Sequence, residues 1–370
     1  MAILEQFKPL LYKMIEVGGS DLHIKSGSNI KARIKGDIIP FSNTIITKEI
    51  ALALVKEILA DRFNQFLSNK EIDFNFKLDE NYRFRGNAFF QMDGVSIVLR
   101  VIPSHIPSLK ELNMPKPLYN LSKLKRGLVL VTGITGSGKS TTLAAMINEI
   151  NQNYQKHIIT IEDPIEFVHK EKKSIINQRS VGEDTLSFAN ALKGALREDP
   201  DIILIGEMRD TETIEIALHA AETGHLVFST LHTLDSKETI NRIIGMFPTN
   251  EQNRIRITLA SILEGVISQR LIKTIDNKRV AAMEILLKTP RISELIRQNR
   301  DDEIIQTLDE GYNIYHTQSF DLALFNLVKQ NLIDINTALE NATNPDDLEL
   351  KLKKASKNNE DLVIKLKNVE

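Results

Sequence analysis

One glycine-rich segment limits what this chain can fold into more than any other. Residues 133–140 read GITGSGKS, directly after the apolar run 128–131 and before the helix-favouring run 141–150. This G-x-x-x-x-G-K-[ST] pattern between a strand and a helix is typical of a phosphate-binding loop, whose backbone N–H groups and helix N-terminus hold phosphate. We expect Lys139 to reach the β- and γ-phosphates of a nucleotide and Ser140 to hold Mg²⁺ through its hydroxyl. The residues expected to line the nucleotide are Gly133, Thr135, Gly136, Ser137, Gly138, Lys139, Ser140 and Thr141.

Composition excludes several other classes of protein. The 370 residues are enough for two domains with cores of their own. A net charge of −2, 6% aromatic residues and no tryptophan argue against a nucleic-acid partner. The absence of cysteine excludes disulfides and a cysteine-based zinc module. An early acid, Glu5, and the lack of a long apolar run argue against a signal peptide or a membrane span, so we expect a cytoplasmic protein that can dock on a membrane complex.

The pattern of predicted elements divides the chain into four regions. Residues 1–102 read as mixed α and β, and repeated prolines in 103–118 predict a linker. In 119–285 strands alternate with helices, which favours a parallel sheet covered by helices on both faces. Residues 286–370 read as helical. The strands expected in the third region are 128–132, 157–161, 201–206 and 226–230, and its helices are 139–150, 184–196 and 211–222.

A glutamate follows the predicted strand 201–206. Glu207 comes directly after the run 201–206. In phosphate-loop enzymes an acid at this place holds Mg²⁺, usually through water, beside the loop serine or threonine. The alternative is a surface acid that merely ends a buried strand.

Three carboxylates, Glu162, Asp163 and Glu166, follow the strand 157–161. The carboxyl ends of parallel strands form the ligand edge of a sheet, where one of these acids could orient and deprotonate an attacking water. The same residues also fit a helix start, with Asp163 as N-cap, Pro164 in the first turn and Glu166 completing a capping box. The residues alone leave both interpretations open.

Histidines stand at both ends of the predicted strand 226–230. His225 and His232 are an odd number of residues apart, so in one regular strand their rings face opposite ways, which argues against joint metal ligation. His232 at the strand end could donate a hydrogen bond to a γ-phosphate, and a buried, satisfied histidine is the alternative. Arginines on first-region strands, Arg83, Arg85 and Arg100, fit either a solvated strand face or an arginine finger.

Several of these segments together resemble the secretion ATPase superfamily, and most of all the type IV pilus retraction ATPases of twitching motility, the PilT/PilU group. The resemblance covers about residues 1–345, and its segments are 19–23, 83–89, 133–140, 160–166, 195–210 and 221–233. It implies an α/β fold with a RecA-like P-loop core, a smaller α+β PAS-like N-terminal domain and a helical C-terminal extension. It also implies a homo-hexameric ring.

The resemblance assigns roles to single residues. Lys139 and Ser140 match the Walker A positions, Glu207 matches the Walker B glutamate, and Glu166 matches the acid assigned as general base. The other matches are His225 and His232 of the His box, and Arg85 and Arg100 among the N-terminal arginines that reach the nucleotide.

The implied activity is Mg²⁺-dependent ATP hydrolysis by a motor that depolymerises a pilus from a platform protein in the inner membrane. The missing tetracysteine zinc module favours retraction over assembly. Residues 291–297 keep the Leu-Ile-Arg of a helix typical of retraction motors but not its Arg-Asn pair, and the C-terminal tail resembles the accessory paralogue. An accessory subunit that depends on a paralogous retraction ATPase therefore remains an alternative, as does a RecA-like nucleic-acid motor.

Overall fold

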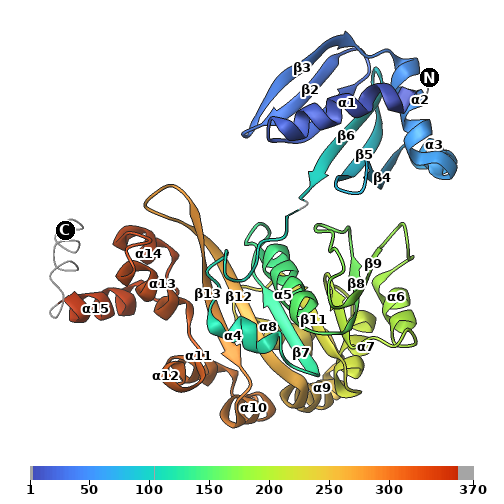
Figure 1. Cartoon of the computed structure of the whole chain (residues 1–370). Helices are drawn as coiled ribbons and strands as arrows, with labels where there is room; N and C mark the ends of the chain where they lie inside the picture. Colours follow the sequence, from blue (N-terminus) through green and yellow to red (C-terminus); the bar gives the residue numbers. More distant parts are fainter. Residues whose placement is uncertain (1–2, 104, 357–370) are drawn as a thin grey trace. The chain divides into compact units, whose positions relative to one another are not determined.

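The computed structural model describes residues 3–103 and 105–356, and the chain divides into two compact units (Figure 1). The first unit comprises Met1–His105 together with Glu166–Val168. The second comprises Ile106–Ile165 and His169–Glu370. Each unit has a sheet of its own.

The first unit contains an antiparallel sheet with strand order β3-β2-β1-β6-β5-β4. Strands β2 and β3 pair as an antiparallel hairpin. The elements of this unit are α1 (Ile3–Glu16), β1 (Gly19–Lys25), β2 (Asn29–Ile34), β3 (Asp37–Ile45), α2 (Lys48–Leu59), η1 (Ala60–Arg62), α3 (Phe63–Asn69), β4 (Glu71–Lys77), β5 (Arg83–Gln91) and β6 (Gly94–Ile102).

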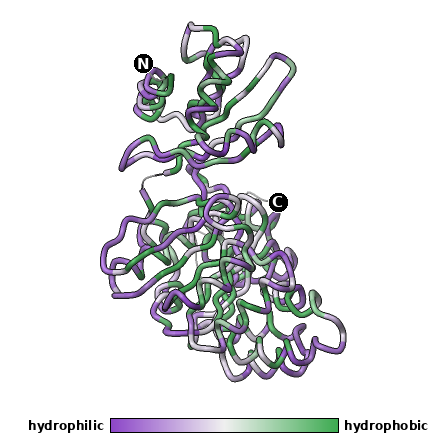
Figure 2. The backbone as a smooth tube through the Cα atoms, turned by 90° about the vertical axis from the view of Figure 1, so that its right-hand side faces the viewer, coloured by the Kyte–Doolittle hydropathy of each residue, from purple (hydrophilic) through white to green (hydrophobic). Residues whose placement is uncertain are grey.

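Apolar and polar residues alternate along the strands, so this sheet has one apolar and one polar face. On β4, Ile72, Phe74 and Phe76 are buried in a core shared with α1 and α2, because side chains two residues apart point the same way. Figure 2 shows apolar residues recurring along the strands and helices. The remaining strand positions are free to carry charged side chains.

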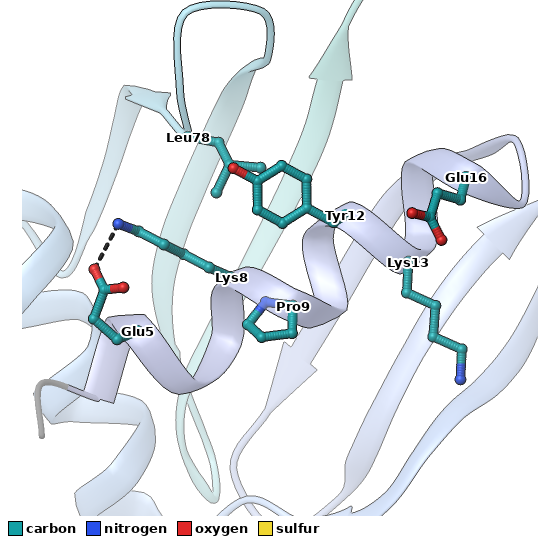
Figure 3. Close-up of a pocket in the computed structure, with 7 residues that line it drawn as sticks. All are labelled: Glu5, Lys8, Pro9, Tyr12, Lys13, Glu16 and Leu78. Atoms are coloured by element: carbon teal, nitrogen blue, oxygen red, sulfur yellow. Dashed lines mark ion pairs between the residues drawn. The ribbon is translucent and has the colours of Figure 1, made fainter.

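Helix α1 covers the apolar face of this sheet and presents polar residues outward. Figure 3 shows an open depression along it, where Nζ of Lys8 pairs with Glu5 at 2.5 Å. The hydroxyl of Tyr12, also on this surface, donates to Asp79 over 2.7 Å. The depression contains neither a glycine loop nor a group of buried acids, so it is not a candidate nucleotide site.

The second unit contains the predicted parallel sheet, with strand order β13-β12-β7-β11-β10-β8-β9. All neighbouring strands are parallel except the β12–β13 pair. The elements up to the end of the sheet are α4 (Lys116–Leu121), β7 (Gly127–Thr132), α5 (Lys139–Asn153), β8 (His157–Glu162), β9 (Ile175–Ser180), α6 (Phe188–Ala195), β10 (Ile202–Ile205), α7 (Thr211–Glu222), β11 (Leu226–Leu231), α8 (Ser236–Gly245), α9 (Thr249–Ile262), β12 (Leu263–Lys273) and β13 (Arg279–Leu287).

Helices cover both faces of this sheet, as the alternating pattern predicts. Val129 and Val131 of β7 pack in the same cluster as the apolar residues of α5. Leu128 and Leu130 of the same strand pack on the other face, in the cluster that contains residues of α7, α8 and α9. Because both faces are covered, every residue of β7 is buried.

Two predicted boundaries need correction. The helix expected over 184–196 begins only at Phe188, because Ser187 caps it by accepting a hydrogen bond from the N–H of Asn190 over 3.1 Å. The helical region expected from 286 onward begins later, because β13 runs to Leu287.

The C-terminal part of the second unit is helical through the last described residue. The expected region ends at 370, and its residues 357–370 lie outside the described part. Helices α13 to α15 bury apolar side chains against Ile272 and Ala282 of the β12–β13 hairpin (Figure 1). Within residues 3–103 and 105–356 no helix combines the length and apolar character needed to cross a bilayer. The elements are α10 (Pro290–Arg297), η2 (Asp301–Glu303), α11 (Ile304–Glu310), α12 (Tyr312–Tyr315), α13 (Phe320–Lys329), α14 (Ile335–Asn341) and α15 (Pro345–Ser356).

Candidate nucleotide-binding site

The glycine-rich loop joins the end of β7 to the start of α5, as the sequence predicts. Gly133, Gly136 and Gly138 have φ angles of 138°, 79° and 92°, a region that favours glycine. At Gly133 a Cβ atom would lie 2.4 Å from the backbone oxygen of Gln269, so no other residue fits without a shift of the backbone. The loop therefore brings its backbone N–H groups and the N-terminus of α5 to one place.

Lys139, the first residue of α5, is only 8% exposed. Its Nζ donates to the backbone oxygens of Gly133 (2.7 Å) and Ile134 (3.1 Å), so the ammonium group lies inside the loop. The hydroxyl oxygen of Ser137 is buried and has no hydrogen-bond partner among the described residues. A cation beside an unpaired buried hydroxyl within a ring of backbone N–H groups suits an anionic ligand such as a phosphate.

The outer rim of the loop is open to solvent. Thr135 and Gly136 are exposed, and Ser140 and Thr141 in the first turn of α5 are partly exposed. A ligand held by the loop can therefore reach these four residues without a rearrangement of the core.

A buried amide that the sequence did not single out holds the loop in shape. Gln269 of β12 is 2% exposed. Its Nε2 donates to the backbone oxygen of Ser137 (2.7 Å), and its Oε1 accepts from the hydroxyl of Thr142 (2.8 Å). One side chain thus ties the loop to the first turn of α5, because β12 lies next to β7 in the sheet. The sequence gives no clear hint, because β12 also contains Glu264, Ser268 and Arg270.

We expect Gln269→Leu to weaken nucleotide binding about tenfold and to lower the melting temperature, because it leaves a buried carbonyl and a buried hydroxyl without partners. Titration with a fluorescent ATP analogue and thermal unfolding test this. Gln306→Leu is the matched control, since within the described part of the chain the amide of Gln306 bonds only to exposed Glu310. Unchanged affinity in Gln269→Leu would show that the amide does not shape the loop.

The acid after β10 and the histidine after β11 come together at the same edge of the sheet as the loop. Oε1 of Glu207 lies 3.4 Å from Nε2 of His232. Because β11 pairs with both β7 and β10 in parallel, the residues that follow these three strands share one edge. The structure therefore groups Glu207, His232 and the loop, in keeping with their predicted roles.

An arginine that the sequence analysis did not select holds Glu207. Arg209 donates to Oε2 of Glu207 from Nε (2.8 Å) and from a terminal guanidinium nitrogen (2.7 Å). This contact raises the pKa of Arg209 above its usual range. Glu207 therefore presents one oxygen to Arg209 and the other to the side of His232.

The three carboxylates at the end of β8 differ in their surroundings. Glu162, the last residue of the strand, is half-buried and accepts from Thr160 (2.7 Å) and Gln178 (3.2 Å). Asp163 and Glu166 are exposed. The assignment of Glu166 as a base remains a prediction.

The alternative of a capped helix at Asp163 is wrong. The described residues 163–174 contain no helix, and the chain continues to the edge strand β9. Oδ1 of Asn151 accepts from the N–H groups of Lys172 and Ser174, which holds the last part of this segment against α5.

The structure places His225 away from the phosphate loop, contrary to its predicted contact with the nucleotide. It precedes β11 and lies at the opposite edge of the sheet, where its backbone oxygen accepts from Gly127, the first residue of β7, over 3.0 Å. The six residues of β11 span about 20 Å at about 3.3 Å per residue. Its Nδ1 instead lies 2.9 Å from the backbone oxygen of Ala220, so the histidine closes the turn after α7.

Arg85 and Arg100, the two arginines predicted to reach the nucleotide, differ in their surroundings. Arg100 pairs with the buried carboxylate of Asp21 at 2.6 Å. That contact, with a bond from Ser20, lowers the pKa of Asp21 although burial opposes the change. Arg85 is the cross-strand neighbour of Arg100 and is exposed. The sheet thus carries these arginines side by side on its polar face.

Comparisons with known proteins agree with this arrangement. A family model described as type II/IV secretion system protein matches residues 2–331. The type IV pilus retractation ATPase PilT of Pseudomonas aeruginosa is 47% identical over 334 residues, which cover 89% of this chain and 96% of that protein. The type IV pilus ATPase PilU of the same species is 40% identical over 361 residues, covering 96% of this chain and 94% of that protein.

A solved structure of the pilus retraction motor PilT with bound ADP has a similar fold. Its TM-score to this chain is 0.85 at 45% identity, and the likeness covers 92% of this chain and 98% of that one. The likeness confirms the predicted α/β fold class.

Proposed function

This chain belongs to the type II/IV secretion system protein family, and we propose that it is an ATP-hydrolysing motor that retracts type IV pili. The observation that carries the proposal is the meeting of a phosphate loop, Glu207 and His232 at one edge of a parallel sheet. Relatives with the names of pilus retraction ATPases match nearly the whole chain. Energy from ATP would then be used to depolymerise a pilus.

In the proposed reaction a water molecule attacks the γ-phosphate in line with the bond that breaks. Backbone N–H groups of the loop and Nζ of Lys139 bind the phosphates and stabilise the charge that develops on them. His232 donates a hydrogen bond to the γ-phosphate and is oriented by Glu207. The orphaned hydroxyl of Ser137 gains a phosphate oxygen as its partner.

Oxygen donors suited to Mg²⁺ stand beside this loop. Ser140 and Glu207 would hold the ion, which neutralises charge on the β- and γ-phosphates when bound. The described residues contain no group of three His, Asp or Glu that could hold a metal ion by themselves. Mg²⁺ commonly takes one or two protein oxygens and completes its shell with phosphate and water.

Two further roles follow from the family. Glu166 would orient or deprotonate the attacking water, and Arg85 or Arg100 would neutralise charge on the transferring phosphoryl group. Of these arginines, Arg85 makes no hydrogen bond or ion pair among the described residues, whereas Arg100 must leave Asp21.

The proposed assembly is a cytoplasmic homo-hexamer on the inner-membrane pilus platform protein. Its subunit would comprise a PAS-like domain (1–102), a linker (103–118), a RecA-like core (119–285) and a helical C-terminal region (286–370). We do not propose a nucleic-acid motor, because net charge and composition argue against one.

A second candidate function is that of an accessory subunit working with a paralogous retraction ATPase. The observation that favours it is the longer match to PilU, which covers 96% of this chain against 89% for PilT.

Deletion of the gene in its own organism tests the proposed function. We expect pili that still extend but no longer retract, seen as more surface pili and lost twitching, with both restored by the wild-type gene. Twitching that persists while retraction force falls would indicate the accessory role. Normal pilus number, force and twitching, or a complete loss of surface pili, would contradict retraction.

A further inference from the structure

Glu284 of β13 is a deeply buried carboxylate that the proposed reaction does not use. It is 2% exposed. Its Oε1 accepts from the backbone N–H (2.7 Å) and the hydroxyl (2.5 Å) of Ser236, and no lysine or arginine pairs with it among the described residues. Burying an acid without a cation is costly, and an apolar residue would fill the same space without that cost.

The sheet places Glu284 in line with the base of the phosphate loop. Glu284 is the cross-strand partner of Ser268 on β12, and Ser268 is the partner of Thr132 on β7. The hydroxyl of Thr132, the residue just before the loop, donates to that of Ser268 over 2.9 Å. Glu284 therefore lies at the carboxyl edge of the sheet, on the face opposite Gln269.

Ser236 connects Glu284 to the histidine of the site. It is the first residue of α8 and comes four residues after His232. The turn between them is rigid, because Asp235 accepts from the N–H of Glu238 (2.7 Å) and Glu238 accepts from that of Leu234 (2.7 Å). The hydroxyls of Thr233 and Thr239 also lie 2.7 Å apart, so the residue next to His232 is joined to the first turn of α8, and a shift of Ser236 would displace the backbone beside His232.

We propose that Glu284 is a positioning residue, which anchors Ser236 and so holds His232 against Glu207 at the nucleotide. The inference rests on the proposed ATP hydrolysis, because only there does His232 have a γ-phosphate to contact. Glu284 itself touches no reacting atom.

The charge of Glu284 changes within the range of cellular pH. Burial raises its pKa to about 7; Asp235, the N-cap of α8, also raises it, and the Ser236 bonds and Arg270 of β12 lower it. The ionised carboxylate makes charge-assisted bonds to Ser236, which are stronger than those of the neutral acid. Turnover should therefore rise as pH increases through about 7.

Stability should change in the opposite direction. Because the folded-state pKa lies above the ordinary value of 4.5, the folded protein binds this proton more tightly than the unfolded chain. The stabilising contribution is complete below pH 4.5 and is lost as pH rises through about 7. Glutamine does not titrate, so Glu284→Gln does not lose this stability as pH rises.

The test compares kcat and KM for ATP between pH 6 and pH 8.5 in the wild type and Glu284→Gln. At pH 8 we expect kcat of the variant to be about tenfold lower with KM within about twofold, the size of one charge-assisted hydrogen bond. The ratio of the two kcat values should approach one at pH 6. Ser236→Ala, which keeps the backbone N–H, should lower kcat about threefold at pH 8.

The melting temperature supplies a readout that is independent of hydrolysis. The melting temperature of Glu284→Gln minus that of the wild type should increase as pH rises through 7. Glu264→Gln is the matched control, since Glu264 pairs with Lys288 at the open end of the same hairpin and does not contact Ser236. This control should keep the wild-type kcat and pH profile.

Each outcome decides the proposal. Equal kcat and equal pH profiles in Glu284→Gln and wild type would overturn it, as would a change in KM alone. If Glu284→Gln does not fold, Ser236→Ala decides: unchanged kcat at pH 8 overturns the proposal. If the wild type binds ATP without hydrolysing it, the proposed function fails, and with it the positioning role, whereas a failure limited to Glu284→Gln leaves hydrolysis intact.

Discussion

Lys139→Ala is expected to abolish ATP hydrolysis, with a loss of about a thousandfold or more in kcat. Nζ of Lys139 already lies inside the phosphate loop, against the backbone oxygens of Gly133 and Ile134. With ATP bound, the same ammonium group would contact the phosphates whose charge grows during the reaction. Alanine removes this charge from a site that is shielded from water, where it has its largest effect.

A coupled assay of phosphate release measures the effect, and circular dichroism and melting confirm that the variant is folded. Lys193→Ala is the control, because Lys193 pairs with Glu212 on the surface and should leave turnover unchanged. Retention of a tenth or more of the wild-type rate by Lys139→Ala would contradict the assigned role.

Glu207→Gln should lower kcat about a hundredfold to a thousandfold while ATP affinity stays within a few fold. Glutamine keeps the size of the side chain but removes the charge that faces Arg209 and His232. The loop that binds the phosphates is untouched, so binding and hydrolysis should separate. The variant should accumulate as an ATP-bound protein.

Equilibrium binding of ATP and single-turnover hydrolysis measure these two effects separately. Glu212→Gln removes an exposed carboxylate and serves as the control. A Glu207→Gln protein that hydrolyses ATP at the wild-type rate would show that Glu207 only ends a strand. Loss of ATP binding would instead assign it to the binding step.

The order of elements in the second unit could be predicted because its signals are local. A run of apolar residues, a loop with glycines and a helix start follow one another at 128–141, and the structure has β7, the loop and α5 there. The N-cap of α7 is Asp210, directly before the predicted start at Thr211. The strands β12 and β13 were not predicted, because their residues pair with each other and with β7 far away in sequence.

The site was predicted only where a motif marks it. Residues of the loop and Glu207 stand in recognisable patterns, whereas Gln269 and Arg209 acquire their roles from partners brought near by folding. His225 was assigned to the nucleotide through its match to the His box, but the six residues of β11 separate it from the sheet edge where His232 lies. Asp163 fitted a helix cap by pattern, but no helix follows it.

The most direct test of the central claim is ATP hydrolysis by the purified chain over a series of protein concentrations, with light scattering after size exclusion on the same samples. The account predicts turnover per subunit that rises as a hexamer forms and that vanishes in Lys139→Ala. A monomer that hydrolyses ATP at the full rate would contradict the ring motor, and a hexamer of wild-type protein without turnover would contradict the assignment as a motor in its own right.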